Sequence, residues 1–168
     1  MVKMPEYPLL DVLNVKRKRI DDAKRLVQKR EEELAEEAEK LKKCEEARDV
    51  VKQHLNDKYD QLRREFEQST NTDKIQRIRA YIDVVKVKLE EENKKVEEQK
   101  KQVEQAEKNL EEAKELLKMR MREVDKLEKH KEEWLKVARR EMELEEAKEL
   151  DEIGSVMFLG HMRKQKNH

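Results

Sequence analysis

The sequence predicts an all-α protein in which two long helices form an antiparallel coiled-coil hairpin, with the second helix longer than the first. Apolar residues recur every seven positions in two series, and a polar connection separates the two. A seven-residue period keeps one stripe of a helix facing a partner helix. Charged residues make up 49% of the chain and aromatic residues only 4%, which is typical of long helices rather than of a compact core.

The first series predicts a helix over residues 9–67, with residues 1–8 as an N-terminal extension that holds both prolines. Proline suits the start of a helix, where its missing N–H is not needed. A weaker second series accompanies the first. Its members are expected to lie three residues after a member of the first series at the start of the helix and to drift to four residues after it. The first series is Leu13, Ile20, Val27, Leu34, Leu41, the exception Arg48, Leu55 and Leu62; the second is Ala23, Ala38, Cys44, Val51, Tyr59 and Phe66.

Residues 68–72 are predicted to be the tip of the hairpin, because no apolar residue occurs from 68 to 73. Ser, Thr and Asn side chains there are candidate helix caps, and Asp73 would complement the dipole of the next helix. An unbroken second series predicts that this helix covers residues 73–153. Folding about the tip pairs residues whose numbers sum to about 141. The cap candidates are Ser69, Thr70, Asn71 and Thr72; the series is Ile75, Ile82, Leu89, Val96, Val103, Leu110, Leu117 and Val124.

The second helix is expected to extend beyond the first, in an overhang that begins at about residue 133. Residues 154–168, which contain two glycines, are predicted to be a flexible tail. The overhang is either a frayed or self-associating end, or an amphipathic helix that docks in a groove of another protein. On the docking interpretation, apolar anchors lie beside an acidic rim. The candidate anchors are Trp134, Leu150, Ile153, Met157 and Phe158, and the candidate rim is Glu149, Asp151 and Glu152.

The charge balance, with 41 basic and 41 acidic residues, argues against a general nucleic-acid binder, which carries a basic excess. It also argues against disorder, together with the periodic spacing of the apolar residues. The densest basic run is residues 16–19. This run is either a solvated helix face or a docking patch for an acidic partner, in which Lys16, Arg17 and Arg19 are the candidate contacts.

The motifs of catalysis and metal binding do not occur in the sequence. No His-Glu-x-x-His, Glu-x-x-His or Cys-x-x-Cys is present, and two glycines cannot form a phosphate-binding loop. The single cysteine, Cys44, cannot form an internal disulfide, and no apolar run has signal-peptide or membrane-spanning length. The sequence therefore predicts a cytoplasmic protein that is not an enzyme and that needs no cofactor, metal or transmembrane segment.

Four local features resemble the small coiled-coil stalk proteins of type III secretion systems, the YscO/FliJ family. They are Leu9-Leu10-Asp11-Val12-Leu13 with the Lys16-Arg17 and Ile20-Asp21-Asp22-Ala23 that follow, Tyr81-Ile82-Asp83-Val84-Val85 after the tip, Trp134, and Glu145 to Ile153 with its Glu-Leu-Asp-Glu string. The resemblance spans most of the chain, and the virulence-type branch is favoured over the flagellar one.

The resemblance implies a non-enzymatic central stalk or escort component, similar in form to the coiled-coil subunit of rotary ATPases. Its implied partners are the hexameric secretion ATPase, the cytoplasmic domain of the export gate and secretion chaperones. The implied location is cytoplasmic, peripheral at the base of a membrane secretion apparatus. Two alternatives stay open: a parallel homodimeric scaffold with no ATPase connection, and a membrane-surface protein that uses its amphipathic C-terminal segment.

The chain is expected to be a monomer in dilute solution, because a parallel dimer would need both helices to run through the polar connection. Light scattering should give the mass of one chain, 20.4 kDa. Small-angle scattering should give a radius of gyration above ~25 Å, whereas a globule of this length would give ~15 Å. A dimer mass would favour the homodimeric scaffold instead.

Overall fold

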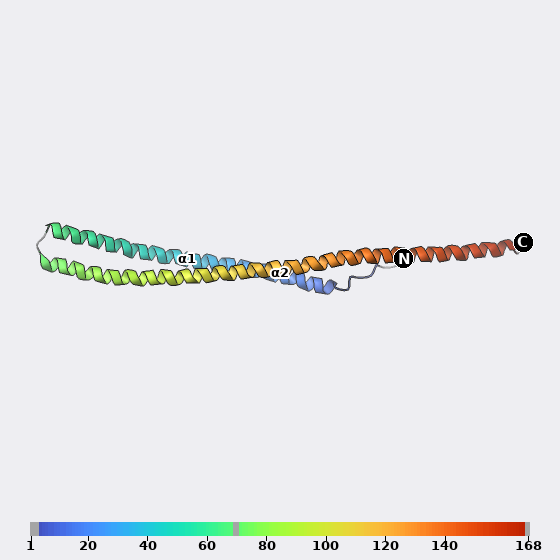
Figure 1. The fold of residues 1–168 in the computed structure, drawn as a ribbon, viewed down its shortest axis with the longest axis horizontal. Coiled ribbons are helices and arrows are strands. Elements are labelled where there is room, and N and C mark those ends of the chain that lie inside the picture. The colour runs from blue at the N-terminus through green and yellow to red at the C-terminus, as the bar shows by residue number, and fades with distance from the viewer. Residues whose placement is uncertain (1–3, 69–70, 167–168) are drawn as a thin grey trace. The chain divides into compact units, whose positions relative to one another are not determined.

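The computed structural model describes residues 4–68 and 71–166. Within these ranges the chain forms two helices, α1 (Leu10–Gln68) and α2 (Thr72–Lys166), and no strand. The helices pack against each other as a hairpin, and α2 is the longer one (Figure 1). The predicted fold class is therefore confirmed. The described residues divide into two compact units, Ala23–Leu116 and residues 4–22 with 117–166.

Local hydrogen bonds start each helix at its observed position. The Leu10 amide donates to the Tyr7 carbonyl oxygen at 3.1 Å and opens α1. The Asn71 side-chain oxygen accepts from the Lys74 amide at 3.4 Å, so Asn71 is the N-cap of α2. Asp73 lies in the first turn of α2, where a carboxylate complements the helix dipole, as predicted. Of the other cap candidates, Thr72 is the first residue of α2, and Ser69 and Thr70 lie outside the described residues.

The core of the unit Ala23–Leu116 is an apolar cluster near the tip. Leu55 of α1 packs with Ile78, Ile82 and Val85 of α2, and each of the four is at most 8% exposed. Val51, Leu62 and Leu89 cover this cluster. Farther from the tip the Gln99 amide donates to both the Glu37 carboxylate and the Glu37 backbone oxygen. These pairs follow the register expected from the sequence.

The other unit repeats the same packing between the start of α1 and the later part of α2. Leu13 is fully buried and Val124 is 6% exposed. The Lys16 ammonium donates to the Glu123 carboxylate across the helix pair at 3.0 Å. Because both units place the seven-residue series at buried or half-buried positions, one sequence pattern accounts for the packing of each.

The second series of α1 does not drift, and this expectation was wrong. Ala38 is exposed, Tyr59 is 39% exposed and Phe66 is 53% exposed. The half-buried positions belong instead to three polar residues one position earlier, Glu37, Lys58 and Glu65. Supercoiling keeps 3.5 residues per turn, so the spacing stays three-four throughout. Each polar residue finds a polar partner: Gln99 for Glu37, Gln61 for Lys58 and Lys74 for Glu65.

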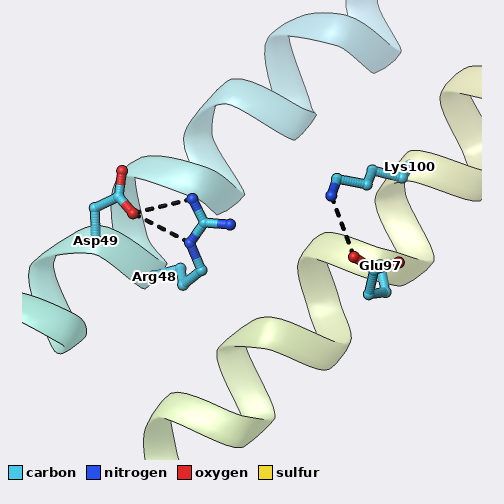
Figure 2. A network of polar contacts seen from close by, with 4 residues as sticks. All are labelled: Arg48, Asp49, Glu97 and Lys100. Atoms are coloured by element: carbon cyan, nitrogen blue, oxygen red, sulfur yellow. Dashed lines mark hydrogen bonds and ion pairs between the residues drawn. The ribbon is translucent and has the colours of Figure 1, made fainter.

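The exception in the first series, Arg48, is accommodated by its neighbour. Its side chain is 28% exposed, and both its Nε and an Nη atom donate to one carboxylate oxygen of Asp49, at 3.1 and 3.0 Å. Figure 2 shows this pair on α1 and a separate ion pair, Glu97–Lys100, on α2. The guanidinium therefore keeps an anionic partner at a position where an apolar side chain was expected.

The second helix extends beyond its predicted end. α2 continues past Ile153 to Lys166, through Gly154 and Gly160. A glycine ends a helix when it adopts a positive φ, and no described glycine does so. No heavy atom of another part of the chain lies within 4 Å of a Cβ built on either glycine, so no close contact requires a glycine at these positions. The flexibility expected of residues 154–168 stays a prediction.

The segment after residue 133 is only partly an overhang. Beyond the start of α1, the N-terminal extension packs on α2: Tyr7 is 5% exposed and its ring lies 5.6 Å from that of Trp134. Ala138 is 5% exposed, and Met142 is half-buried. The overhang expected from about residue 133 is thus partly covered, because Tyr7 of the N-terminal extension packs on Trp134.

Val96 and Val87 offer a matched test of the seam, because they lie on one helix and are 1% and 57% exposed. Val96→Asp places a charge in the closed seam and is expected to lower the free energy of unfolding by about 3 kcal/mol or more. Val87→Asp is expected to change it by less than ~0.5 kcal/mol. Urea unfolding followed by circular dichroism measures both, and equal losses would show that the seam is assigned to the wrong face.

Candidate functional site

The part of α2 after Met142 is the candidate site, because every residue from 143 to 165 is exposed. We call residues 143–166 the C-terminal segment. Its large apolar side chains are between 47% and 69% exposed. They are Leu144, Leu150, Ile153, Val156, Met157, Phe158, Leu159 and Met162. Such a contiguous exposed apolar surface is typical of an interaction site.

The apolar residues of the C-terminal segment surround the helix. Leu150, Ile153 and Met157 share one face by their i, i+3, i+7 spacing, as the sequence predicts. Phe158 lies on a different face, together with Met162. A helix that is apolar on all sides is normally buried within a larger structure. The arrangement therefore suits insertion between surfaces better than contact along one stripe.

Charges are sorted along the same segment. Residues 141–152 are mostly acidic, residues 153–162 contain no Asp, Glu, Lys or Arg, and Arg163 and Lys164 follow. A shallow groove of about 460 Å³ lies at the acidic boundary, lined by Glu149, Glu152, Ile153, Val156 and Met157. The predicted rim residues Glu149 and Glu152 thus lie beside two apolar candidates, and Asp151 is exposed nearby on the helix.

Trp134 belongs to a different environment from the other candidate anchors. It is half-buried in an edge-to-face contact with Tyr7 at an interplanar angle of 65°. The Tyr7 hydroxyl also lies within hydrogen-bonding distance of His130 Nδ1, at 2.7 Å. The structure therefore separates Trp134 from Leu150, Ile153, Met157 and Phe158, which are exposed.

The basic run of α1 is partly used within the chain. Lys16 pairs with Glu123 and Arg17 pairs with Glu128, both at 3.0 Å, whereas Arg19 is exposed. The hydrogen bond from Lys16, more than the charge of Arg120 nearby, holds the pKa of Glu123 below its ordinary value, although partial burial opposes the shift. Lys16 and Arg17 thus have structural partners, and their docking role stays a prediction.

Sequence reasoning missed an exposed group of side chains near the tip. Arg79 lies 5.3 Å from the ring centre of Phe66, and Lys86 lies 5.6 Å from that of Tyr59. Both rings line an open groove of about 680 Å³ on α1. On α2, Tyr81, Val84 and Val87 are 45%, 64% and 57% exposed. A strict three-four spacing from Leu13 would have placed Tyr59 and Phe66 outside the seam.

Metal-binding clusters and membrane-spanning stretches were sought in the part of the chain that the structure describes. No group of three His, Cys, Asp or Glu residues there could hold a metal ion, and Cys44 is a free, half-buried thiol. Over residues 4–68 and 71–166, neither helix has a stretch apolar enough to cross a lipid bilayer.

Comparison with known proteins agrees with this description. The model of the YscO-like family, described as YscO-like protein, matches residues 4–164. The chain belongs to the YscO-like family. A solved structure of CT670 from Chlamydia trachomatis, described as a YscO homolog, is similar to this chain with a TM-score of 0.91 and 42% sequence identity. The match covers 96% of this chain and 99% of CT670. No curated protein matches the chain.

Membership of the YscO-like family makes this chain a stalk-type protein of type III secretion, associated with the secretion apparatus. Members of the family are structural proteins of that apparatus rather than enzymes. The resemblance drawn from the sequence is thereby confirmed.

The lowered pKa of Glu123 predicts an acid-dependent loss of stability. A carboxyl whose pKa is lower in the folded state stabilises the fold above its ordinary value of 4.5, and this contribution is lost as the pH falls through the folded pKa. Glu123→Gln should therefore reduce stability at pH 7 and flatten its decline as the pH falls below the ordinary value of 4.5. Urea unfolding at several pH values tests this, with Glu98→Gln at an exposed position as the control. Identical pH profiles for Glu123→Gln and the wild type would contradict it.

Proposed function

We propose that this chain is a non-enzymatic stalk or escort component of a type III secretion apparatus and that its C-terminal segment is the principal docking element. Its proposed partners are the hexameric secretion ATPase, the cytoplasmic domain of the export gate and secretion chaperones. The proposed location is cytoplasmic, at the base of the apparatus. Family membership supports the setting, and the exposed C-terminal segment supports the docking role.

The observation that carries the proposal is the contrast between two parts of one helix. From Ile75 to Ala138, α2 places its apolar residues of the seven-residue series at buried or half-buried positions. After Met142 the apolar residues become exposed, and they surround the helix. Side chains such as Leu150 and Met157 are both 69% exposed and contribute little to packing within the chain, so burial by a partner would stabilise the complex.

The charges of the C-terminal segment indicate the kind of groove that would receive it. The acidic residues on its N-terminal side, Glu149 and Glu152 among them, favour basic residues at one rim of the groove. The uncharged stretch 153–162 favours an apolar interior, and Arg163 with Lys164 favours acidic residues at the far rim. A subunit boundary in a ring-shaped ATPase can supply such a graded surface.

The hairpin itself argues for a monomer in the proposed role. The apolar series of α1 is occupied by α2 of the same chain, as in the cluster of Leu55, Ile78 and Ile82. A parallel homodimer would need these same stripes for a second chain. The packing therefore favours a monomer, and the homodimeric scaffold is the alternative to be tested.

The proposal predicts that charge on one face of the C-terminal segment abolishes docking without harm to the hairpin. Leu150→Asp with Met157→Asp should weaken binding to the secretion ATPase more than tenfold, since each buried anchor contributes about 1.5–3 kcal/mol. The matched control is Val15→Asp with Val50→Asp, at α1 positions that are 50% and 70% exposed. Isothermal titration calorimetry measures affinity, and circular dichroism checks the fold.

Two results would contradict the proposal in different ways. Equal affinities of the two double variants would place the docking surface elsewhere on the chain. If the wild-type chain neither binds the ATPase nor changes its rate of ATP hydrolysis, a scaffold without ATPase coupling becomes the better description.

A further inference from the structure

The N-terminal extension packs on the part of α2 that lies beyond the first residue of α1. α1 begins at Leu10, yet the seam of α2 continues through Trp134, which is half-buried, and Ala138, which is 5% exposed. Residues 4–9 are not helical, and their Tyr7 contacts His130 and Trp134 of α2. We call residues 4–9 the strap.

Tyr7 is the most deeply buried side chain of the strap. It is 5% exposed, whereas Met4 and Leu9 are half-buried and Pro5, Glu6 and Pro8 are exposed. The Tyr7 ring lies 5.6 Å from Trp134 and 5.7 Å from His130, and its hydroxyl shares a 2.7 Å hydrogen bond with His130 Nδ1. Removal of this one ring would therefore remove the main contact that holds the strap on α2.

The backbone hydrogen bonds of the strap are local. The Leu10 amide donates to the Tyr7 carbonyl oxygen and the Leu13 amide to that of Leu9, both within the start of the chain. Proline has no N–H to donate to α2, and its fixed φ keeps a short segment extended when it is released. Among the described residues, the strap thus resembles a lid held by a side chain rather than a third layer of the fold.

The hairpin beneath the strap has deeply buried residues of its own. Leu13 is fully buried, and Val124 is 6% exposed at the first contact between the helices. Local openings of a protein follow the parts with few buried apolar contacts and few shared backbone hydrogen bonds. The strap meets both conditions, and the helix pair from Leu13 onward meets neither.

We propose that the strap is a displaceable cover, which leaves α2 while the hairpin stays folded and thereby exposes an apolar surface around Trp134 and Ala138. Leu135, Ala138 and Met142 follow the helical spacing that leads to Leu150 and Ile153. An open strap therefore lengthens the apolar face of the C-terminal segment toward the hairpin. The part of this inference that concerns docking rests on the proposed function, whereas the opening itself does not.

Trp134 reports the state of the strap directly, because it is the only tryptophan of the chain. Tyr7→Ala should at least double the Stern–Volmer constant for quenching of Trp134 by acrylamide and shift its emission to longer wavelength. Circular dichroism should show unchanged helix content. Tyr7→Phe keeps the ring and should stay close to the wild type, which separates ring packing from the hydrogen bond.

The chain provides a matched control at the other unit. Tyr81 makes the same kind of pair with His54, with a 2.9 Å hydrogen bond and ring centres 5.7 Å apart, but it is 45% exposed. Tyr81→Ala should leave the quenching of Trp134 unchanged. Equal quenching in Tyr7→Ala and Tyr81→Ala would overturn the proposal, because the strap would then not cover Trp134.

Urea titration of the wild-type chain tests whether the strap opens while the hairpin stays folded. If the strap opens by itself, acrylamide access to Trp134 rises at lower urea concentrations than the loss of helix signal, and this early phase is missing in Tyr7→Ala. Coincident transitions would overturn the proposal, since two probes that report one transition indicate one cooperative unit. A fall in the unfolding midpoint of Tyr7→Ala as large as that of Val96→Asp would also overturn it. None of these measurements requires the ATPase, so their failure is distinct from failure of the proposed function.

Discussion

The rest of the structure depends on one constraint: each helix must cover the apolar stripe of the other in a strict three-four spacing. The stripe supplies nearly all of the buried apolar surface, including Leu13, Val96 and the cluster around Ile82. A chain with 49% charged residues has few other ways to remove apolar surface from water. Since the two stripes belong to one chain, the pairing also fixes which residues remain for contact with other proteins.

Polar residues within the stripe show how strict this spacing is. Glu37, Lys58 and Glu65 occupy half-buried positions, while the larger apolar Tyr59 and Phe66 stay exposed one position away. The spacing therefore prevails over side-chain hydrophobicity, and the polar groups are tolerated because each one has a hydrogen-bond or ion-pair partner. The displaced aromatic residues become surface features, stacked beneath Lys86 and Arg79.

The sequence predicted the two helices and the register of their packing, because a seven-residue period is a direct consequence of coiled-coil geometry. It misplaced features that depend on packing outside that period. Tyr7 in a proline-containing extension gives no periodic signal, so its contact with Trp134 could not be foreseen. Gly154 was interpreted as a helix end, since glycine is a common terminator, and only its backbone angle shows that α2 continues. Leu150, Ile153 and Met157 were foreseen on one face because spacing alone determines it.

The central claim is that the hairpin leaves the C-terminal segment exposed and that this segment binds the secretion apparatus. Hydrogen exchange of the full chain, followed by mass spectrometry with and without the secretion ATPase, tests it most directly. The account predicts that amides within residues 143–166 exchange quickly in the free chain and become protected at least tenfold in the complex, while those of Ala23–Leu116 keep the protection they have alone. Protection confined to Ala23–Leu116, with no change in residues 143–166, would contradict the account.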